Sequence, residues 1–449
     1  EYHLGVDGLG LVGVLLATLV PLMAVVASGR VAMGRERLYY GLVLVLESGL
    51  LGTFTALNFF HWFLFWELSL VPAYLLVRMF GGSRAGPAAF QFFVYTMVGS
   101  VALLLGFLAL RAAGGSFDFI ELAEMGRSGR LAEALASGVA WGGADGGGGE
   151  GLVWVVFAGV LLGFAVKVPL WPFHTWLPDT YTEAPTPVSM LLTGVMSKMG
   201  VYGLLRIAWP IFPEQFMAAQ WLLVPLAVAT VLMPAVAAFA QQDVKRVLAY
   251  SSVNHLGYCL LGMTGVPAGM ALGPMMEGAA APVLNGVILQ MLNHGLTAAA
   301  LFGFVGVLEE RTGGSRDLRE LGGLGQAAPV FCGLMSVSVF ASLGLPGLNG
   351  FISEFLIFKG VFGVVPAAGA FALLGLLGSA VFLLTMIQRV FHGPLKPGWG
   401  GVADLSGRER LAFAVPTVLM LALGIFPGLV LRWLDPTVMA FLGGGGVWR

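Results

Sequence analysis

The stretch from residue 151 to residue 175 reads GLVWVVFAGVLLGFAVKVPLWPFHT. Its first sixteen residues contain no charged side chain, and an apolar run of about 20 residues is enough to cross the hydrocarbon of a bilayer. Lys167 follows this run, and Pro169 and Pro172 then remove backbone donors and disrupt helix geometry. The stretch therefore predicts a membrane-spanning helix that bends or breaks beside a buried charge.

The composition extends this interpretation to the whole chain. Of 449 residues, 58% are hydrophobic and 10% are charged, against roughly 25% charged in soluble proteins. The hydrophobic residues would fill about a dozen spans, which excludes a soluble enzyme and a disordered regulator. A net charge of −1 gives no electrostatic footprint for nucleic acid. Cys259 and Cys332 are too few and too far apart for a disulfide framework or an iron–sulfur ligand set.

The predicted fold is an all-α polytopic membrane protein with twelve spans, because no strict two-residue alternation suggests a barrel. The spans are expected at 9–28, 38–57, 59–80, 88–111, 151–175, 185–206, 217–240, 246–266, 281–308, 327–362, 367–390 and 411–434. The stretch 327–362 is too long for one straight span, and Leu345-Pro346-Gly347-Leu348-Asn349-Gly350 should break it.

The loops indicate an orientation. Fourteen of the 23 Lys and Arg fall in loops on one side and six on the other, so the first side is predicted to be cytoplasmic and both ends of the chain to face away from it. The segment 112–150 is expected to be a flexible external insertion, and 307–326 a charged cytoplasmic linker. The chain begins at Glu1 without a signal peptide, which suggests a fragment.

Two broken helices in corresponding positions are typical of transporters built from inverted repeats. The breaks after Lys167 and before Glu354 suggest two five-helix halves. The domains expected on this basis are 1–37, 38–206, 207–390 and 391–449. No sequence identity between the halves is visible, so the division depends on the breaks alone.

Several ionisable residues lie inside the predicted spans. A lone charge at mid-membrane costs several kcal/mol, so such residues need partners or water and often mark proton relays. The acids are Glu47, Glu67 and Glu354, the lysines are Lys167, Lys198 and Lys359, and the histidines are His174, His255 and His294.

Each of these residues also has a structural interpretation. Glu47 alone could be a hydrogen-bonding group, and Lys359, near a helix end, could extend its ammonium to the membrane surface. Lys198 lies mid-span and cannot do so easily. Burial disfavours the charged form of each group and pairing restores it, so proton affinity changes when a pair opens. As a set, the residues therefore indicate a proton pump or antiporter, whereas a structural scaffold would use them only to join helices.

The motifs around these residues resemble a known family. They are KVPLWPFHTWLPD at 167–179, EAPTPVS at 183–189, SKMGVYG at 197–203, WELSLVP at 66–72, DVKRVLAYSS at 243–252, NHLGY at 254–258 and GFISEF at 350–355. Together they resemble the antiporter-like membrane subunits of respiratory complex I. The acid at Glu354 is similar to the M-type subunit (subunit 4), and the FFHW start at 59–62 resembles the cyanobacterial D-type subunit.

The resemblance implies residue roles. Glu67 and Lys167 would be the coupled pair of the first half-channel, and Lys198 the central bridge. His255 and His294 would be relays, Glu354 the exit site, and Glu47 a further acid of the pathway. The family's fourteen spans imply that two spans precede this chain. Two departures concern Thr180-Tyr181 and Gln91, where many relatives have His and Lys.

The resemblance also implies an assembly. The chain would carry no cofactor, while quinone and NAD(P)H or ferredoxin would be used by the whole complex. Its partners would be L-, N- and K-type membrane subunits, a peripheral redox arm and the lipid bilayer, with no nucleic acid. It would lie in a bacterial plasma membrane or a thylakoid membrane. The alternatives are a subunit of a multisubunit Na⁺/H⁺ antiporter or of a membrane-bound hydrogenase.

Overall fold

The structure is a computed structural model that describes residues 2–29, 31–138, 148–270 and 277–443. Within these ranges the chain is helical, and its only β-type pairings are isolated bridges. The helices of the first half are α1 (Gly8–Ala27), α2 (Glu36–Thr55), α3 (Phe59–Phe80), α4 (Ala85–Gly114), α5 (Phe119–Arg127), α6 (Arg130–Gly138), α7 (Gly148–Lys167) and α8 (Trp176–Glu183).

The next span, Thr186–Ile211, is one continuous run of short α and π segments. These are α9 (Thr186–Leu191), the π turn η1 (Leu192–Met196), α10 (Lys198–Gly203), the π turn η2 (Leu204–Ala208) and α11 (Trp209–Ile211). The second half contains α12 (Pro213–Ala218), α13 (Gln220–Phe239), α14 (Val244–Met270), α15 (Glu277–Arg311), α16 (Leu324–Ala327), α17 (Pro329–Ser342), α18 (Asn349–Val364), α19 (Pro366–Phe391), α20 (Gly407–Ile425) and α21 (Gly428–Leu442).

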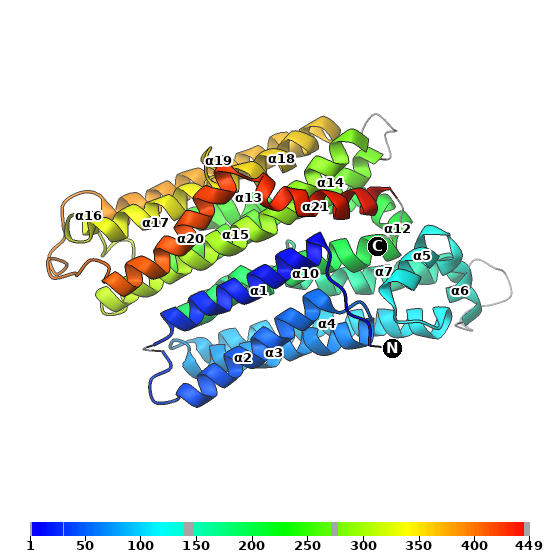
Figure 1. Cartoon of the computed structure of the whole chain (residues 1–449), viewed down its shortest axis with the longest axis horizontal. Coiled ribbons are helices and arrows are strands. Elements are labelled where there is room, and N and C mark those ends of the chain that lie inside the picture. The colour runs from blue at the N-terminus through cyan, green and yellow to red at the C-terminus, as the bar shows by residue number, and fades with distance from the viewer. Residues whose placement is uncertain (1, 30, 139–147, 271–276, 444–449) are drawn as a thin grey trace.

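The long helices run side by side along the longest axis of the molecule (Figure 1). Helices α1–α4 lie on one side of the bundle and α13–α20 on the other. The start of α1 and the end of α21 lie at the same end, beside α5 and α6. The opposite end holds α16 and is called the α16 end below. It is the end that the sequence predicts to be cytoplasmic.

The predicted spans are confirmed as helices, although they do not all pass as single spans. In the described ranges, nine helices are long and apolar enough to cross a membrane, or ten when the bent pair α20–α21 is counted as one. Both predicted breaks are present, because α7 ends at Lys167 and α17 and α18 are separated around Pro346. The chain is therefore an integral, multi-pass membrane protein. The division into two inverted halves stays a prediction.

Two expectations were wrong in detail, and one confirmed span is irregular. The insertion 112–150 is not simply flexible, since α5 and α6 form within it and Asp118 caps α5 through its carboxylate; residues 139–147 lie outside the described part. The span 185–206 contains two π turns. The span 411–434 is bent by 64° between α20 and α21, where Pro427 interrupts the backbone hydrogen bonds.

Burial identifies the centre of the bundle. The most apolar window of Thr186–Ile211 is entirely buried and that of Ala280–Arg311 is 94% buried, whereas α3, α4 and α19 are 39% buried. The outer helices therefore present apolar side chains outward, as a lipid-facing surface requires. The central helices are enclosed by protein on all sides, so a charge on them must find its partner within the bundle.

Close contact between α2 and α3 depends on Gly49. A Cβ at this position would lie 2.8 Å from the Ser69 nitrogen and 3.0 Å from the Phe65 oxygen, both backbone atoms that cannot move aside. We expect Gly49→Val to destabilise the protein by about 1–3 kcal/mol, as overpacking does. Gly41→Val is the matched control on α2, because a Cβ there meets nothing within 4 Å. Denaturant unfolding in detergent measures both, and equal stabilities would contradict the packing role.

Candidate functional site

Lys198 is the most deeply buried cation of the central helices, with none of its surface exposed. Its Nζ donates a hydrogen bond to the Thr193 carbonyl oxygen. That oxygen lies in the first π turn, where the Ser197 N–H bonds to the Leu192 oxygen five residues back. The ordinary helical donor to Thr193 is thereby displaced, and the ammonium group takes a place on its carbonyl.

His294 on α15 is the second partner of Lys198. Lys198 Nζ and His294 Nδ1 are 2.8 Å apart. The two helices can approach this closely because Gly194 and Gly295 face each other; a Cβ on Gly295 would lie 2.7 Å from the Gly194 oxygen. The contact joins the predicted bridge to a predicted relay.

His255 on α14 continues the row. Its ring stacks on that of His294, with centroids 5.2 Å apart and planes 14° from parallel. Nδ1 lies 2.7 Å from the Ser251 oxygen and Nε2 lies 2.8 Å from the Ser342 oxygen. A carbonyl oxygen only accepts, and a neutral imidazole has one N–H. Both contacts are therefore hydrogen bonds only when His255 carries two protons.

Glu354 on α18 ends the row. Its Oε1 is 3.7 Å from His255 Nε2, within ion-pair range, and has no hydrogen-bond partner. The break between α17 and α18 makes room for it, because Gly344 (φ +67°) lies where a Cβ would be 2.1 Å from Glu354 Oε2. Lys198, His294, His255 and Glu354 thus form one buried polar row across α10, α15, α14 and α18.

The first half is arranged differently. Lys167 is buried at the end of α7, and its Nζ lies 4.9 Å from the centre of the Trp66 ring, a cation–π contact. Glu67 is close enough to act on Lys167 electrostatically, but no ion pair within 4.0 Å joins them in the described part of the chain. One Glu67 oxygen is buried without a hydrogen bond. The predicted pair is therefore near but open.

The remaining predicted groups lie apart from the row. Glu47 is partly exposed on α2 and makes no ion pair or hydrogen bond within the described residues. His174 lies in the break after α7 with its Nδ1 buried and unbonded. Lys359 lies over the Phe355 ring at 5.9 Å.

The sequence assigned two buried cations to loops. Arg206, 1% exposed, lies in the second π turn and pairs with the α1 cap residue Asp7 and with Tyr202. Lys245, 2% exposed, lies in the first turn of α14. Both were predicted to be loop charges, and the structure shows instead that both are buried in the bundle. A sequence signal existed only for Lys245, which lies in the charged run DVKR at 243–246, whereas Arg206 stands alone in LLRIAWP at 204–210.

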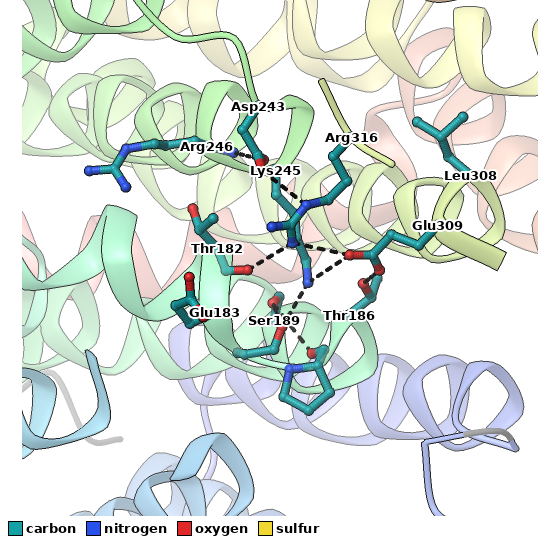
Figure 2. A network of polar contacts seen from close by, with 12 residues as sticks. Thr182, Glu183, Thr186, Ser189, Asp243, Lys245, Arg246, Leu308, Glu309 and Arg316 are labelled. Atoms are coloured by element: carbon teal, nitrogen blue, oxygen red, sulfur yellow. Dashed lines mark hydrogen bonds and ion pairs between the residues drawn. The ribbon is translucent and has the colours of Figure 1, made fainter. Parts of the chain in front are cut away.

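Lys245 is the centre of a polar network at the α16 end (Figure 2). Its Nζ donates to the Ala184 oxygen at 2.7 Å and lies 3.5 Å from Glu309. Arg316 joins Glu309 at 3.1 Å and donates to the Thr182 oxygen at 3.0 Å. The two cations thus bind the last carbonyl groups of α8, where the helix dipole favours positive charge.

The same network holds the next helix. Glu309 accepts a hydrogen bond from the Thr186 hydroxyl, at the start of the run that carries Lys198. Arg316 also pairs with Asp243 at 2.9 Å, beside the start of α14. The network therefore fixes the joint between α8 and α9 against α14 and α15, the helices that carry His255 and His294.

Comparisons with known proteins show the family of this chain. Residues 56–381 match the family described as NADH:quinone oxidoreductase/Mrp antiporter, transmembrane. The chain belongs to this family. It is 37% identical over 98% of its length to NAD(P)H-quinone oxidoreductase chain 4 1 of Synechococcus elongatus, covering 78% of that protein. It is 35% identical to NADH-quinone oxidoreductase subunit M of Rhodobacter capsulatus, with 98% and 81% covered.

Chains of two solved membrane complexes have a similar fold. Respiratory complex I from Thermus thermophilus contains a chain with a TM-score of 0.82 and 32% identity, covering 98% of this chain and 85% of that one. The Mrp complex of Dietzia contains a chain with a TM-score of 0.83 at 20% identity, which shows a shared fold. The M-type resemblance inferred from Glu354 is confirmed.

Removing the charge of Lys245 should weaken the joint. Lys245→Met removes the ammonium group from the Ala184 carbonyl and leaves Glu309 paired with Arg316 alone, and we expect a loss of about 2–4 kcal/mol in unfolding free energy. Arg246→Met is the control: this neighbour pairs with Asp179 at 2.8 Å, but both side chains are about 30% exposed, so the loss should be below about 1 kcal/mol. Thermal or denaturant unfolding of both variants checks this. Equal losses would show that burial of Lys245 does not matter.

Proposed function

We propose that this chain, a membrane-arm subunit of a complex I-type NAD(P)H or ferredoxin:quinone oxidoreductase, moves protons through its buried row. One observation carries the proposal: Lys198, His294, His255 and Glu354 come from four helices yet lie in one continuous polar row within an apolar bundle. Assembly into such an oxidoreductase is supported by relatives that are named as NADH- and NAD(P)H-quinone oxidoreductase subunits.

The row supplies four sites for successive proton transfers. Lys198 as an ammonium gives a proton to His294 Nδ1 along their 2.8 Å contact and becomes a neutral amine. The stacked rings have no direct hydrogen bond, so transfer from His294 to His255 requires a water molecule or a ring rotation. His255 then passes a proton from Nε2 to Glu354, 3.7 Å away, and the neutral acid releases it from the end of the row.

The first half of the chain supplies the switch, which is the Glu67–Lys167 pair. Lys167 has the Trp66 ring as its close neighbour, and among the described residues no carboxylate lies within 4 Å of it and one Glu67 oxygen has no hydrogen bond. Closing the Glu67–Lys167 pair would stabilise the charged forms of both groups. Opening it would favour proton movement from Lys167 toward Lys198. The two lysines lie on helices in direct contact, since a Cβ on Gly200 would be 2.8 Å from the Val168 nitrogen.

Quinone reduction elsewhere in the complex would drive this switch. On this proposal the quinone and the NAD(P)H or ferredoxin bind to other subunits. The partners are L-, N- and K-type membrane subunits and the peripheral redox arm, in a bacterial plasma membrane or thylakoid. Structural similarity to chains of a complex I and of an Mrp complex supports assembly with other membrane subunits.

The family description also includes Mrp antiporters, so a Na⁺/H⁺ antiporter subunit is the second candidate function. Proteoliposomes containing the purified native assembly separate the two. A sodium-driven pH gradient without an electron donor would favour the antiporter. A pH gradient that appears only with NAD(P)H or reduced ferredoxin and quinone favours the oxidoreductase.

Lys198→Ala removes the centre of the row. We expect proton transfer through this chain to fall by at least roughly 100-fold, so the complex should translocate fewer protons per electron pair. Glu67→Gln should also lower the number of protons translocated per electron pair, because it removes the carboxylate of the switch. Lys359→Ala is the control, since its ammonium lies outside the row. Unchanged proton yield with normal electron flux in Lys198→Ala would overturn the proposed function.

Gly344→Ala tests the position of the exit acid. The new methyl group would occupy the space of Glu354 Oε2 and turn the carboxylate away from His255, so proton yield should fall as in Glu354→Gln. Gly347→Ala is the matched control, because Gly347 also has a positive φ (+91°) but a Cβ there meets nothing within 4 Å. The same loss in both variants would attribute the effect to backbone strain alone.

A further inference from the structure

A pocket outside the buried row lies at the α16 end, where α13 and α19 finish. Its volume is about 560 Å³. Two loop segments, 318–322 and 392–396, form most of its wall, and Gln242 and Arg389 complete it from the ends of α13 and α19. Because the sequence predicts this end to be cytoplasmic, the pocket lies at the level of one membrane surface.

The wall of the pocket is basic. It contains three permanent cations, Arg319, Arg389 and Lys396, together with His392 and no carboxylate. Arg319 is partly neutralised by Asp317 at 2.6 Å, and its hydrogen bonds lower the pKa of Asp317 to about 2, so that this carboxylate stays ionised and committed to Arg319. Arg389 and Lys396 have no ion pair in the described ranges. Lys396 Nζ donates to the Arg319 carbonyl oxygen and lies close enough to Asp317 to contribute to the lowered pKa of that carboxyl. The pocket therefore presents Arg389 and the remaining N–H donors of Lys396 to an anion.

The two loops are fixed to each other. The Gly323 N–H bonds to the His392 oxygen at 3.1 Å, and the Lys396 N–H bonds to the Gly322 oxygen at 3.3 Å. Gly323 has φ +71°, and a Cβ there would lie 2.4 Å from the Leu395 backbone, so only glycine permits this approach. Arg389 is held by a 3.2 Å hydrogen bond to Gln242. The cations thus have defined positions.

An apolar surface leads away from the pocket along both helices. Helices α13 and α19 pack against each other, with the Phe239 and Phe382 rings 6.1 Å apart. Outward apolar side chains along them are exposed, among them Val236 (65%) near the pocket end of α13 and Leu377 (58%) on α19. A basic pocket at the membrane surface beside an apolar helix pair matches a ligand with an anionic head and hydrocarbon chains.

We propose that this pocket binds the phosphate headgroup of an anionic phospholipid, whose acyl chains lie along α13 and α19. The fixed guanidinium group of Arg389 and the ammonium group of Lys396 bind the phosphate oxygens. Phosphatidylcholine, which has the same chains but no net charge, gains less from these two cations. Free phosphate shares the head chemistry but lacks the chains that the helix surface would bury.

The test uses the whole complex in nanodiscs of phosphatidylcholine with a small fraction of phosphatidylglycerol that carries a photoactivatable acyl chain. Peptide mass spectrometry then measures the label on α13 and α19. The variant is Arg389→Gln/Lys396→Gln. The control is Arg37→Gln/Arg84→Gln, which removes two exposed charges at the same end of the bundle. Each basic residue near a membrane surface contributes on the order of five-fold in affinity, so labelling in the first variant should fall roughly thirty-fold.

The comparison of lipids in the unchanged complex keeps the proposal testable if the double variant does not assemble. Photoactivatable phosphatidylglycerol should label α13 and α19 well above photoactivatable phosphatidylcholine. Equal labelling by the two lipids, or equal losses in variant and control, would overturn the proposal. Competition by excess inorganic phosphate at constant ionic strength would assign the pocket to free phosphate. Absence of label on α13 and α19 in the unchanged complex would also overturn the proposal.

Discussion

The rest of the structure depends on one constraint: a hydrogen-bond donor buried in an apolar bundle has no water to bind, and three such side chains bind a carbonyl oxygen that lacks its usual helical donor. Lys198 binds the Thr193 carbonyl, which a π turn releases from its usual helical donor. Lys245 binds the Ala184 carbonyl at the end of α8. His255 binds the Ser342 carbonyl, where α17 stops. In each case an irregularity of a helix supplies the acceptor that water would supply in a soluble protein.

This constraint explains which parts of the fold the sequence could predict. Apolar length predicts helices, and Pro169 and the segment around Pro346 predict breaks because proline removes a donor and glycine permits positive φ. The π turns on either side of Lys198 contain no proline and no glycine with a positive φ, and each depends on one extra residue in the hydrogen-bond register. Sequence patterns carry no signal for that register.

The candidate site also contains residues that the sequence could predict and residues that it could not. Buried charges are conspicuous in sequence, so Lys198, His255, His294 and Glu354 could be selected, and the structure brings them together. Their order could not be derived from residues alone, because it depends on which helices enclose the centre. Lys245 and Arg206 were missed for the opposite reason: each stands next to a helix end, and sequence position cannot show that other helices cover that end.

The joint between α8 and α9 connects the buried row to the network around Lys245. Helix α8 lies between Lys167, which ends α7, and Thr186, which begins the run that carries Lys198. Lys245 and Arg316 hold the end of α8 while Glu309 holds Thr186, so the segment that separates the two lysines is fixed to the helices of the second half. The network at the α16 end therefore joins the segment between Lys167 and Lys198 to α14 and α15, the helices that carry His255 and His294, through charged groups that lie outside the row.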